Sequence, residues 1–394
     1  MYHIGIIRSA SSPVSRKKYN VQEIGLASEL SELGMKVDVF LITDEKGSYN
    51  ETINDRVIIH WIRGFKIPGQ QGVYPELNRI LDSSHYDLIQ ALDDSQITTV
   101  LVSLYCRKKG IRFVLWQGMY ENYHEMYKRI IQFFYDRTFL KVLKANTKFC
   151  IAKTTSAKKY IIDKGIQNTI VIPVGLSIGN FNEKKRIDYR EKLGISTEKK
   201  ILLYIGKVEK RRMPIFCLNV FERLKKLHDD VSLVFVGNGP LLNDAKEYSA
   251  KEKLTDIYFI NQIRQDELPS LYKEADFFIL PTRYEIFGMV LMESMFFGTP
   301  VITYKAAGPL DLIIDDQDGL LLNDFEIDNW VERLAYHIFV KRDSHIMGKN
   351  ASTKIQKEYL WKTISKKYYC AYMDILNPTD SVSQQRTEHI EEAE

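Results

Sequence analysis

The sequence predicts an α/β protein made of two doubly wound domains that face a cleft. Short apolar runs alternate with segments of helical periodicity, and this alternation occurs in two series separated by a polar stretch rich in Lys and Glu at 180–200. The length of 394 residues exceeds one ordinary core and suits two domains of somewhat under 200 residues. Each series therefore predicts one parallel sheet covered by helices.

The first series opens with a strand at 4–7, a polar loop at 8–19 and a helix. Asn20, with Glu23 three residues later, indicates the start of that helix, and Gly34 indicates its end. Further strands are predicted at 37–42, 57–61, 88–91, 113–116 and 149–152.

The second series predicts another doubly wound sheet and a closing helix. Its strands are expected at 201–205, 231–236, 257–260, 277–280 and 301–303. The final helical segment contains Trp361 and Tyr368. We therefore predict domains at 1–178 and 179–376, with the closing helix in the second, and a polar, disordered tail at 377–394.

Composition narrows the class of protein. The chain is 45% hydrophobic and 27% charged, and no apolar run approaches the roughly 20 residues of a spanning helix. The N-terminal residues read as a strand rather than a secretion signal, and the four cysteines have no metal or disulfide spacing. We expect a cytoplasmic protein that binds no nucleic acid.

The most informative segment is 281–293, which follows a buried strand and leads into a helix. In such sheets, ligands bind beyond the carboxyl ends of the strands. Glu285 would lie in the loop and Glu293 about two turns into the helix, and paired carboxylates suit the vicinal hydroxyls of sugars. The alternative is that Glu285 caps the helix and Glu293 is solvated.

Pro281, Glu285, Phe287-Gly288 and Glu293, followed by Gly298-Thr-Pro-Val301, resemble the signature of the retaining glycosyltransferases of family four, the glycosyl transferases group 1. The resemblance extends in register from about 201 to 322. It implies the GT-B fold and transfer of a hexosyl-type sugar, with retention, from a UDP- or GDP-linked donor. The acceptor would be a glycan, glycolipid or other molecule of cell-surface polysaccharide or glycoconjugate synthesis.

The same resemblance assigns the donor site. Gly206 and Lys207, with Arg212 downstream, are similar to the family turn whose two cations hold the diphosphate, although Lys207 replaces an arginine and Arg212 a lysine. Lys210 or Arg211 could take the second role. Glu285 would orient the sugar and Glu293 the ribose. The remaining donor contacts would come from Gly237, Ile260, Ile263, Ile286, Phe287 and Gly288.

The first half resembles the family more loosely. Trp116, Gln117 and Tyr120 are the expected acceptor side, yet Gln117 stands where relatives commonly have histidine, and the first loop offers Ser9 and other serines in place of a glycine pair. Core packing is the alternative explanation of this aromatic cluster.

No metal site or other cofactor is predicted. The eight histidines include no pair at helical zinc spacing, and the Asp-Asp pairs do not follow the strands that a metal–diphosphate site would use. Fixed cations, Lys207 and Arg212, would instead stabilise the departing diphosphate. We expect no covalent intermediate.

Residues 127–144 mix aromatic and aliphatic side chains with basic ones that include Lys128, Arg129, Lys141 and Lys144, a composition that suits a helix on a membrane surface. A buried helix with solvated ends fits about as well. The basic cluster 107–109 could also contact anionic headgroups at the inner face of a membrane. Rival functions are a nucleotide-sugar epimerase or hydrolase of the same fold, and a non-catalytic partner subunit of another transferase.

Overall fold

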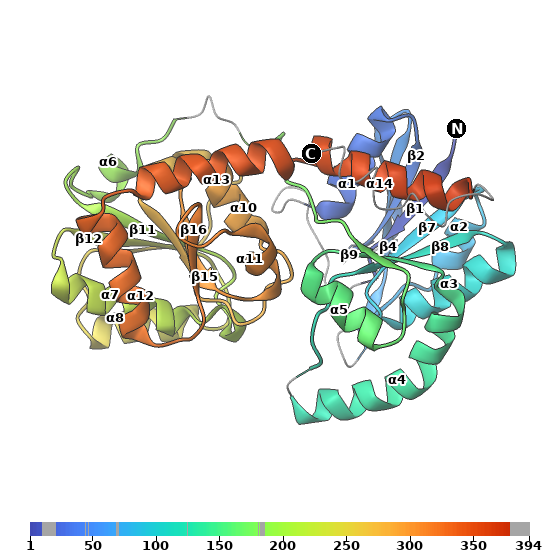
Figure 1. Cartoon of the computed structure of the whole chain (residues 1–394), viewed down its shortest axis with the longest axis horizontal. Helices are drawn as coiled ribbons and strands as arrows, with labels where there is room; N and C mark the ends of the chain where they lie inside the picture. The colour runs from blue at the N-terminus through green and yellow to red at the C-terminus, as the bar shows by residue number, and fades with distance from the viewer. Residues whose placement is uncertain are drawn as a thin grey trace.

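The computed structural model describes residues 1–9, 21–43, 45, 47–67, 71–123, 125–179, 181 and 186–378, and it contains two parallel-stranded sheets that lie beside each other (Figure 1). Helices lie on the faces of both sheets. This arrangement confirms the predicted pair of doubly wound α/β units.

The N-terminal sheet has the strand order β10-β9-β8-β7-β1-β2-β4-β3, and only β3 runs antiparallel to its neighbour. Its strands are β1 (His3–Ile7), β2 (Lys36–Thr43), β3 (Tyr49–Asn54), β4 (Val57–Arg63), β7 (Leu88–Leu92), β8 (Arg112–Gln117), β9 (Phe149–Ala152) and β10 (Thr169–Val171), with a separate hairpin of β5 (Phe65–Ile67) and β6 (Gln71–Val73). Its helices are α1 (Gln22–Glu32), α2 (Leu77–Leu81), α3 (Ile97–Lys109), α4 (Met126–Asn146) and α5 (Thr155–Asp163).

The C-terminal sheet has the order β13-β12-β11-β14-β15-β16. Its strands are β11 (Lys200–Ile205), β12 (Val231–Val236), β13 (Ile257–Ile260), β14 (Phe277–Leu280), β15 (Val301–Tyr304) and β16 (Gly319–Leu322). Around it lie α6 (Tyr189–Leu193), the 3₁₀ turn η1 (Lys210–Arg212), α7 (Pro214–Leu227), α8 (Leu242–Lys251), α9 (Leu268–Glu274), α10 (Met289–Phe296), α11 (Ala307–Leu312), α12 (Ile327–Ala335), the π-helical turn η2 (Tyr336–Val340) and α13 (Ser344–Glu358).

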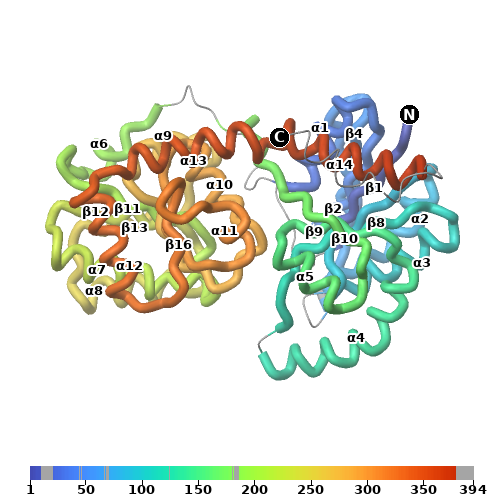
Figure 2. The backbone as a smooth tube through the Cα atoms, viewed as in Figure 1, coloured from blue at the N-terminus to red at the C-terminus, as the bar shows by residue number. Residues whose placement is uncertain are grey.

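The last helix, α14 (Trp361–Leu376), corrects the predicted domain assignment. We placed 179–376 in the second domain, but α14 crosses back and packs beside α1 on the N-terminal sheet (Figure 2). The Trp116 indole donates to the Tyr368 hydroxyl at 2.8 Å, and the Tyr372 hydroxyl donates to Gln90 at 2.8 Å. These buried aromatic side chains hold the helix on the first domain because their polar atoms find partners there.

The start of the first helix also differs from its prediction. Asn20 lies outside the described residues, the N-cap is Val21 without a side-chain bond, and Glu23 is buried against Arg8, at 3.1 Å, rather than forming a capping box. The predicted tail falls almost wholly at 379–394, outside the described residues.

Both sheets change strand order at an internal point, between β7 and β1 in one and between β11 and β14 in the other. At such a point the loops that leave neighbouring strands diverge and leave a crevice at the carboxyl edge. The loops after β11 and β14 carry most of the predicted donor residues.

Candidate active site

Glu285 lies in the loop after β14, where it meets two arginines from the loop after β11. Its Oε2 lies 3.3 Å from Arg211 Nη1 and 3.3 Å from Arg212 Nη2. Only 8% of Glu285 is exposed, so this ion pair is largely removed from water. The structure therefore brings the predicted site residues Glu285 and Arg212 together and adds Arg211.

Two nitrogen atoms of the Arg212 guanidinium remain available as hydrogen-bond donors. Its Nε and Nη1 are buried and have no partner within the described residues. A Cβ on Gly206 would lie 3.2 Å from Arg212 Nη1, so the bare glycine gives the guanidinium room to lie across the turn. A buried guanidinium with unpartnered donors is well suited to an anionic ligand.

Lys207 is connected through Glu209 to one of the arginines that bind Glu285. Its side chain is 65% exposed, and its Nζ lies 3.1 Å from Glu209. Arg211 binds the same Glu209 and also donates to the Tyr284 carbonyl at 2.6 Å. Burial raises the pKa of Glu209, but Arg211 and Lys207 outweigh it and hold that pKa below its ordinary value. Glu209 therefore acts as an anionic link between the two cations.

Glu293 is 5% exposed on α10, and the Tyr272 hydroxyl donates to its Oε2 at 3.1 Å. Burial and the Glu293 charge raise the pKa of Tyr272, while the charge of Arg212 opposes that shift. Arg212 therefore forms an ion pair with Glu285, and its charge also acts on Tyr272, the hydrogen-bond partner of Glu293.

The glycine turns pack backbone on backbone. A Cβ on Gly237 would lie 1.9 Å from the Gly206 carbonyl oxygen, so a side chain is excluded there. The Gly237 N–H donates to the carbonyl of Ile260 at 2.9 Å, and Ile263 is half-buried just beyond. The ends of β11, β12 and β13 are therefore held together as the predicted donor edge.

The segment 286–288 links the two acids. Phe287 is buried, and Gly288 has φ +95°, a conformation that favours glycine, as the N-cap of α10. A Cβ on Gly308 would lie 2.3 Å from Phe287 Cα, and the Gly308 N–H donates to the Glu285 carbonyl at 3.1 Å. Ile286 faces the other domain, since its Cγ2 would lie 3.1 Å from a Cβ on Gly118.

Tyr120 brings the N-terminal domain to this loop. Its hydroxyl oxygen accepts from the Glu285 N–H at 3.1 Å, and its ring stacks on Tyr284 with centroids 4.5 Å apart. Burial raises the pKa of Tyr120, so the hydroxyl stays protonated and can also donate. Of the three predicted acceptor-side residues, Tyr120 is the one that reaches the Glu285 loop.

Trp116 and Gln117 correct the acceptor-side prediction. Both are 0% exposed. Trp116 is bonded to Tyr368, with Lys153 Nζ 4.0 Å from its ring centroid, and Gln117 exchanges bonds of 2.8 and 3.0 Å with Asp94. Because their side chains are used inside the domain, neither can stack on or bond to an acceptor.

Sequence reasoning missed Asp93 and Lys153 at the carboxyl edge of the N-terminal sheet. Asp93 Oδ1 accepts from the N–H groups of Gly118 and Met119 at 2.7 and 3.1 Å. Burial lowers the pKa of Lys153 to about 8, although Asp93 opposes the shift. Their positions directly after predicted strands were a signal that could have identified them.

None of the described residues form a cluster of three or more His, Cys, Asp or Glu able to hold a metal ion. Likewise, no helix in the described ranges combines the length and apolarity needed to cross a membrane.

Comparison with known proteins finds similarity mainly in the C-terminal half. Residues 185–354 match the family model of the glycosyl transferases group 1. The alpha-monoglucosyldiacylglycerol synthase of Streptococcus pneumoniae is 34% identical over 157 residues, which cover 38% of this chain and 36% of that protein. Across three curated relatives, the match spans 32% to 50% of the relative's length.

Longer matches are more distant. The Escherichia coli UDP-Gal:alpha-D-GlcNAc-diphosphoundecaprenol alpha-1,3-galactosyltransferase is 23% identical over 81% of this chain and 84% of its own. The sucrose-phosphate synthase structure from Thermosynechococcus elongatus covers 96% of this chain and 100% of its own, with a TM-score of 0.75 and 19% identity. This likeness confirms the predicted GT-B fold. Residues 185–354, which carry all the donor-side residues described above, are therefore similar in sequence to the glycosyl transferases group 1.

Proposed function

We propose that the protein is a glycosyltransferase that moves a hexosyl-type sugar from a UDP- or GDP-linked donor to a glycan or lipid-linked acceptor. The observation that carries the proposal is Arg212, a buried guanidinium with two unpartnered nitrogens beside Glu285. The planar fork of an arginine matches the oxygens of a diphosphate.

Each donor group has a counterpart at this edge. Arg212 and Arg211 face the diphosphate, with Lys207 supporting them through Glu209. Glu285 orients the sugar hydroxyls and Glu293 the ribose hydroxyls, because a buried carboxylate is a strong acceptor for vicinal hydroxyl groups. Ile260 and Ile263 offer main-chain atoms to the base.

The proposed reaction proceeds with retention and without a metal or a covalent intermediate. The bond between the anomeric carbon and the diphosphate oxygen breaks, and Arg212 stabilises the charge on the departing oxygen. The acceptor hydroxyl then bonds to the anomeric carbon on the same face and passes its proton to that oxygen. Tyr120, bonded to the Glu285 loop, couples acceptor-side closure to the sugar site.

Several relatives have names that point to membrane lipids, among them the diacylglycerol-linked synthase and the diphosphoundecaprenol transferase. We therefore propose a lipid-linked or glycan acceptor of cell-surface synthesis, peripheral membrane contact and a cytoplasmic location.

The test is a panel of uridine, guanosine and adenosine diphosphate sugars, read by thermal stabilisation and by slow hydrolysis of the donor. One base and one sugar should stabilise the protein, and hydrolysis should persist in a metal chelator. Stabilisation by none of them, or loss of activity in the chelator, would contradict the proposal. Release of an epimerised or free sugar that no acceptor can capture would favour the epimerase or hydrolase. Binding without any turnover would favour a non-catalytic partner subunit.

A further inference from the structure

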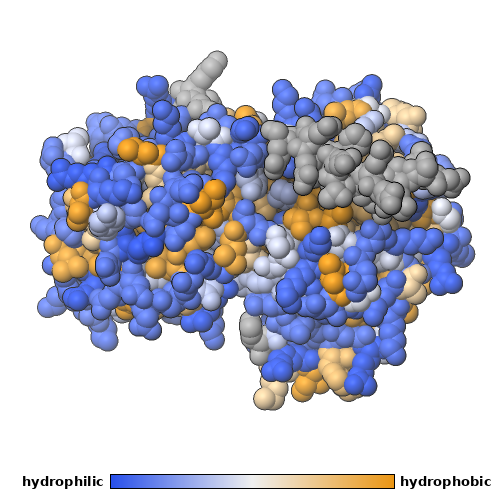
Figure 3. Space-filling view, in the orientation of Figure 1, coloured by the Kyte–Doolittle hydropathy of each residue, from blue (hydrophilic) through white to orange (hydrophobic). Residues whose placement is uncertain are grey.

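Helix α4 exposes an unusual number of large apolar side chains. Between 41% and 79% of each of the following residues is exposed: Met126, Tyr127, Ile130, Ile131, Phe133, Phe134 and Phe139. In Figure 3 apolar side chains gather at the lower tip of the N-terminal domain, where Figure 1 places α4. An apolar group of this size on a surface usually marks an interaction site.

Most of these side chains fall on one stripe that changes character along the helix. At helical spacing, the α4 stripe comprises Met126, Ile130, Phe133, Phe134, Arg137, Lys141 and Lys144. Its first half is apolar and its second half is basic. The Arg137 guanidinium carbon lies 4.3 Å from the Phe133 ring centroid, so the two halves are in contact.

The opposite side of α4 is fixed to the domain. Tyr135 is buried, and its hydroxyl donates to the Asp94 carbonyl at 2.9 Å. The Oδ1 of Asp136, the only acidic residue of the helix, lies 3.3 Å from the Nζ of Lys164, the C-cap residue of α5. The α4 stripe is therefore held outward, and it contains three basic residues and no acidic residue.

The charge of the helix identifies the occupant. α4 carries five Lys or Arg (128, 129, 137, 141 and 144) against Asp136 alone. Protein interfaces bury cores that are depleted of charged side chains, whereas a bilayer surface offers acyl chains beside anionic phosphates. An apolar half next to a basic half matches the second surface.

We propose that the α4 stripe docks on the surface of an anionic lipid bilayer. This inference deepens the proposed function, on which it rests for its biological purpose, by naming the surface and the lipid charge. The apolar half enters the boundary between headgroups and acyl chains, and Arg137, Lys141 and Lys144 contact lipid phosphates.

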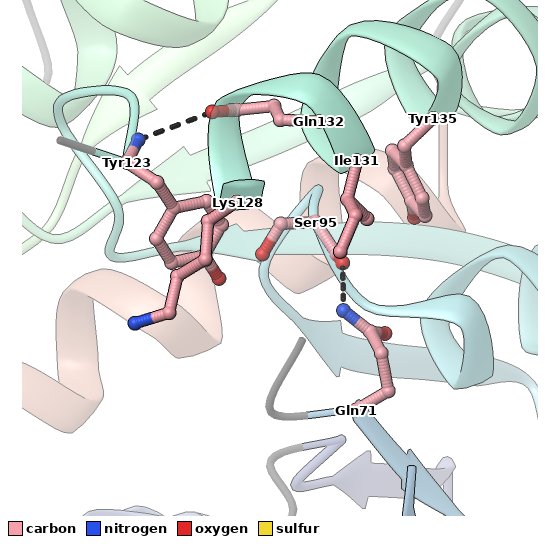
Figure 4. A pocket seen from close by; sticks show the side chains of 7 residues that line it. All are labelled: Gln71, Ser95, Tyr123, Lys128, Ile131, Gln132 and Tyr135. Atoms are coloured by element: carbon pink, nitrogen blue, oxygen red, sulfur yellow. Dashed lines mark hydrogen bonds between the residues drawn. The ribbon is translucent and has the colours of Figure 1, made fainter. Parts of the chain in front are cut away.

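Docking there places the reaction side of the domain near the lipid. The first turn of α4 follows the segment that holds Tyr120 against the Glu285 loop. The first two turns of α4 also line a small hollow, through Lys128, Ile131 and Gln132, which they share with Ser95 and Tyr123 (Figure 4). A lipid-linked acceptor would thus approach the domain beside its contact with the donor loop.

The test compares sedimentation of the full chain with vesicles of phosphatidylcholine alone and of phosphatidylcholine mixed with phosphatidylglycerol. Wild type should bind the mixed vesicles. Ile130→Glu/Phe134→Glu should weaken binding at least about 100-fold, because two apolar side chains no longer enter the lipid. Arg137→Ala/Lys141→Ala/Lys144→Ala should weaken it roughly 100-fold, at about fivefold per cation.

Val340→Glu/Ile346→Glu is the matched control, since these residues are 70% and 53% exposed on the other domain, and it should bind as wild type does. Donor stabilisation measured without vesicles should be unchanged in all variants, which separates this inference from the proposed function. Equal binding to both vesicle types would overturn the lipid-charge assignment. Failure to bind vesicles, or self-association that Ile130→Glu/Phe134→Glu abolishes, would overturn the docking.

Discussion

The carboxyl edges of the two sheets are built on the same plan but treat their polar groups differently. At the C-terminal edge, Arg212 keeps two buried nitrogens without a partner among the described residues. At the N-terminal edge, Gln117, Asp93 and Asp94 bond to one another or to the nearby main chain. The difference teaches that Arg212 keeps donors available for a charged ligand, while Gln117, Asp93 and Asp94 use their polar atoms to hold the loops of their own edge in place.

The largest effect in this comparison is expected for Arg212→Ala. If the reserved donors hold the diphosphate, kcat/KM should fall about 1000-fold, as expected for loss of a preorganised charged donor. Steady-state kinetics with the preferred donor measure this. Arg223→Ala, which removes an arginine half-exposed beside Asp328, is the control and should change little. A loss of less than tenfold for Arg212→Ala would place the anion elsewhere.

Glu285→Gln comes next. The amide keeps the shape of the side chain but removes the charge that binds Arg211 and Arg212. In the proposed reaction the same charge accepts hydrogen bonds from the sugar. Turnover should fall about 100-fold with a smaller change in KM, because the interaction strengthens as the sugar becomes cationic. Unchanged kcat would remove the assignment of Glu285 to the sugar.

Glu293→Gln should act on binding rather than on turnover. Loss of a charged acceptor for the ribose is expected to raise the donor KM or Kd about tenfold and to leave kcat close to wild type. Calorimetric titration of the donor checks this. An effect confined to kcat would show that Glu293 contacts the reacting sugar instead.

At the N-terminal edge, Lys153 should make the free energy of unfolding depend on pH. Burial lowers the pKa of Lys153 to about 8, so between that pH and its ordinary value near 10.4 the unfolded chain holds a proton that the native state has released. The free energy of unfolding should therefore rise with pH there, by at most about 1.4 kcal/mol per pH unit from this group. Urea unfolding of wild type and Lys153→Met measures it, and parallel pH profiles would contradict the assignment.

Tyr120→Phe should have the smallest effect. It removes one neutral hydrogen bond between the edges, that to the Glu285 N–H, and keeps the stack on Tyr284. The net value of such a bond, about 1 kcal/mol, predicts a roughly fivefold lower kcat. Tyr105→Phe, on the exposed side of α3, is the control. A 100-fold loss would instead make the Tyr120 hydroxyl part of the chemistry.

Strands were predicted correctly from the sequence where they form continuous apolar runs. Strands such as β12 and β14 are fully buried and were predicted within a residue of their bounds. The edge strand β3 was missed because its sequence, Tyr-Asn-Glu-Thr-Ile-Asn, is mostly polar and partly exposed. The three-residue strand β10 was missed because so short a run carries little periodicity, and β16 was missed as well.

The candidate site followed the same division. Position after a predicted strand singled out Glu285 and Glu293, and the family resemblance pointed to Arg212. Arg212 and Glu285 follow the neighbouring strands β11 and β14, and Glu293 lies on α10. Trp116 was predicted to face the acceptor, but its side chain is buried and bonded to α14, a helix about 250 positions later in the sequence. No local sequence pattern contains that contact. Contacts between distant parts of the chain, rather than residue type, determine which aromatic side chains remain accessible to a ligand.

The polypeptide passes between the lobes twice, and the two passages are tied together. The Leu176 N–H donates to the Tyr359 carbonyl at 2.7 Å, and the Trp361 N–H donates back to the Leu176 carbonyl at 3.3 Å. A double connection of this kind resists shear and twisting of one lobe against the other, and leaves bending about the paired segments as the easy motion. Opening and closing of the two lobes over a substrate would then be a hinge rotation about these paired segments.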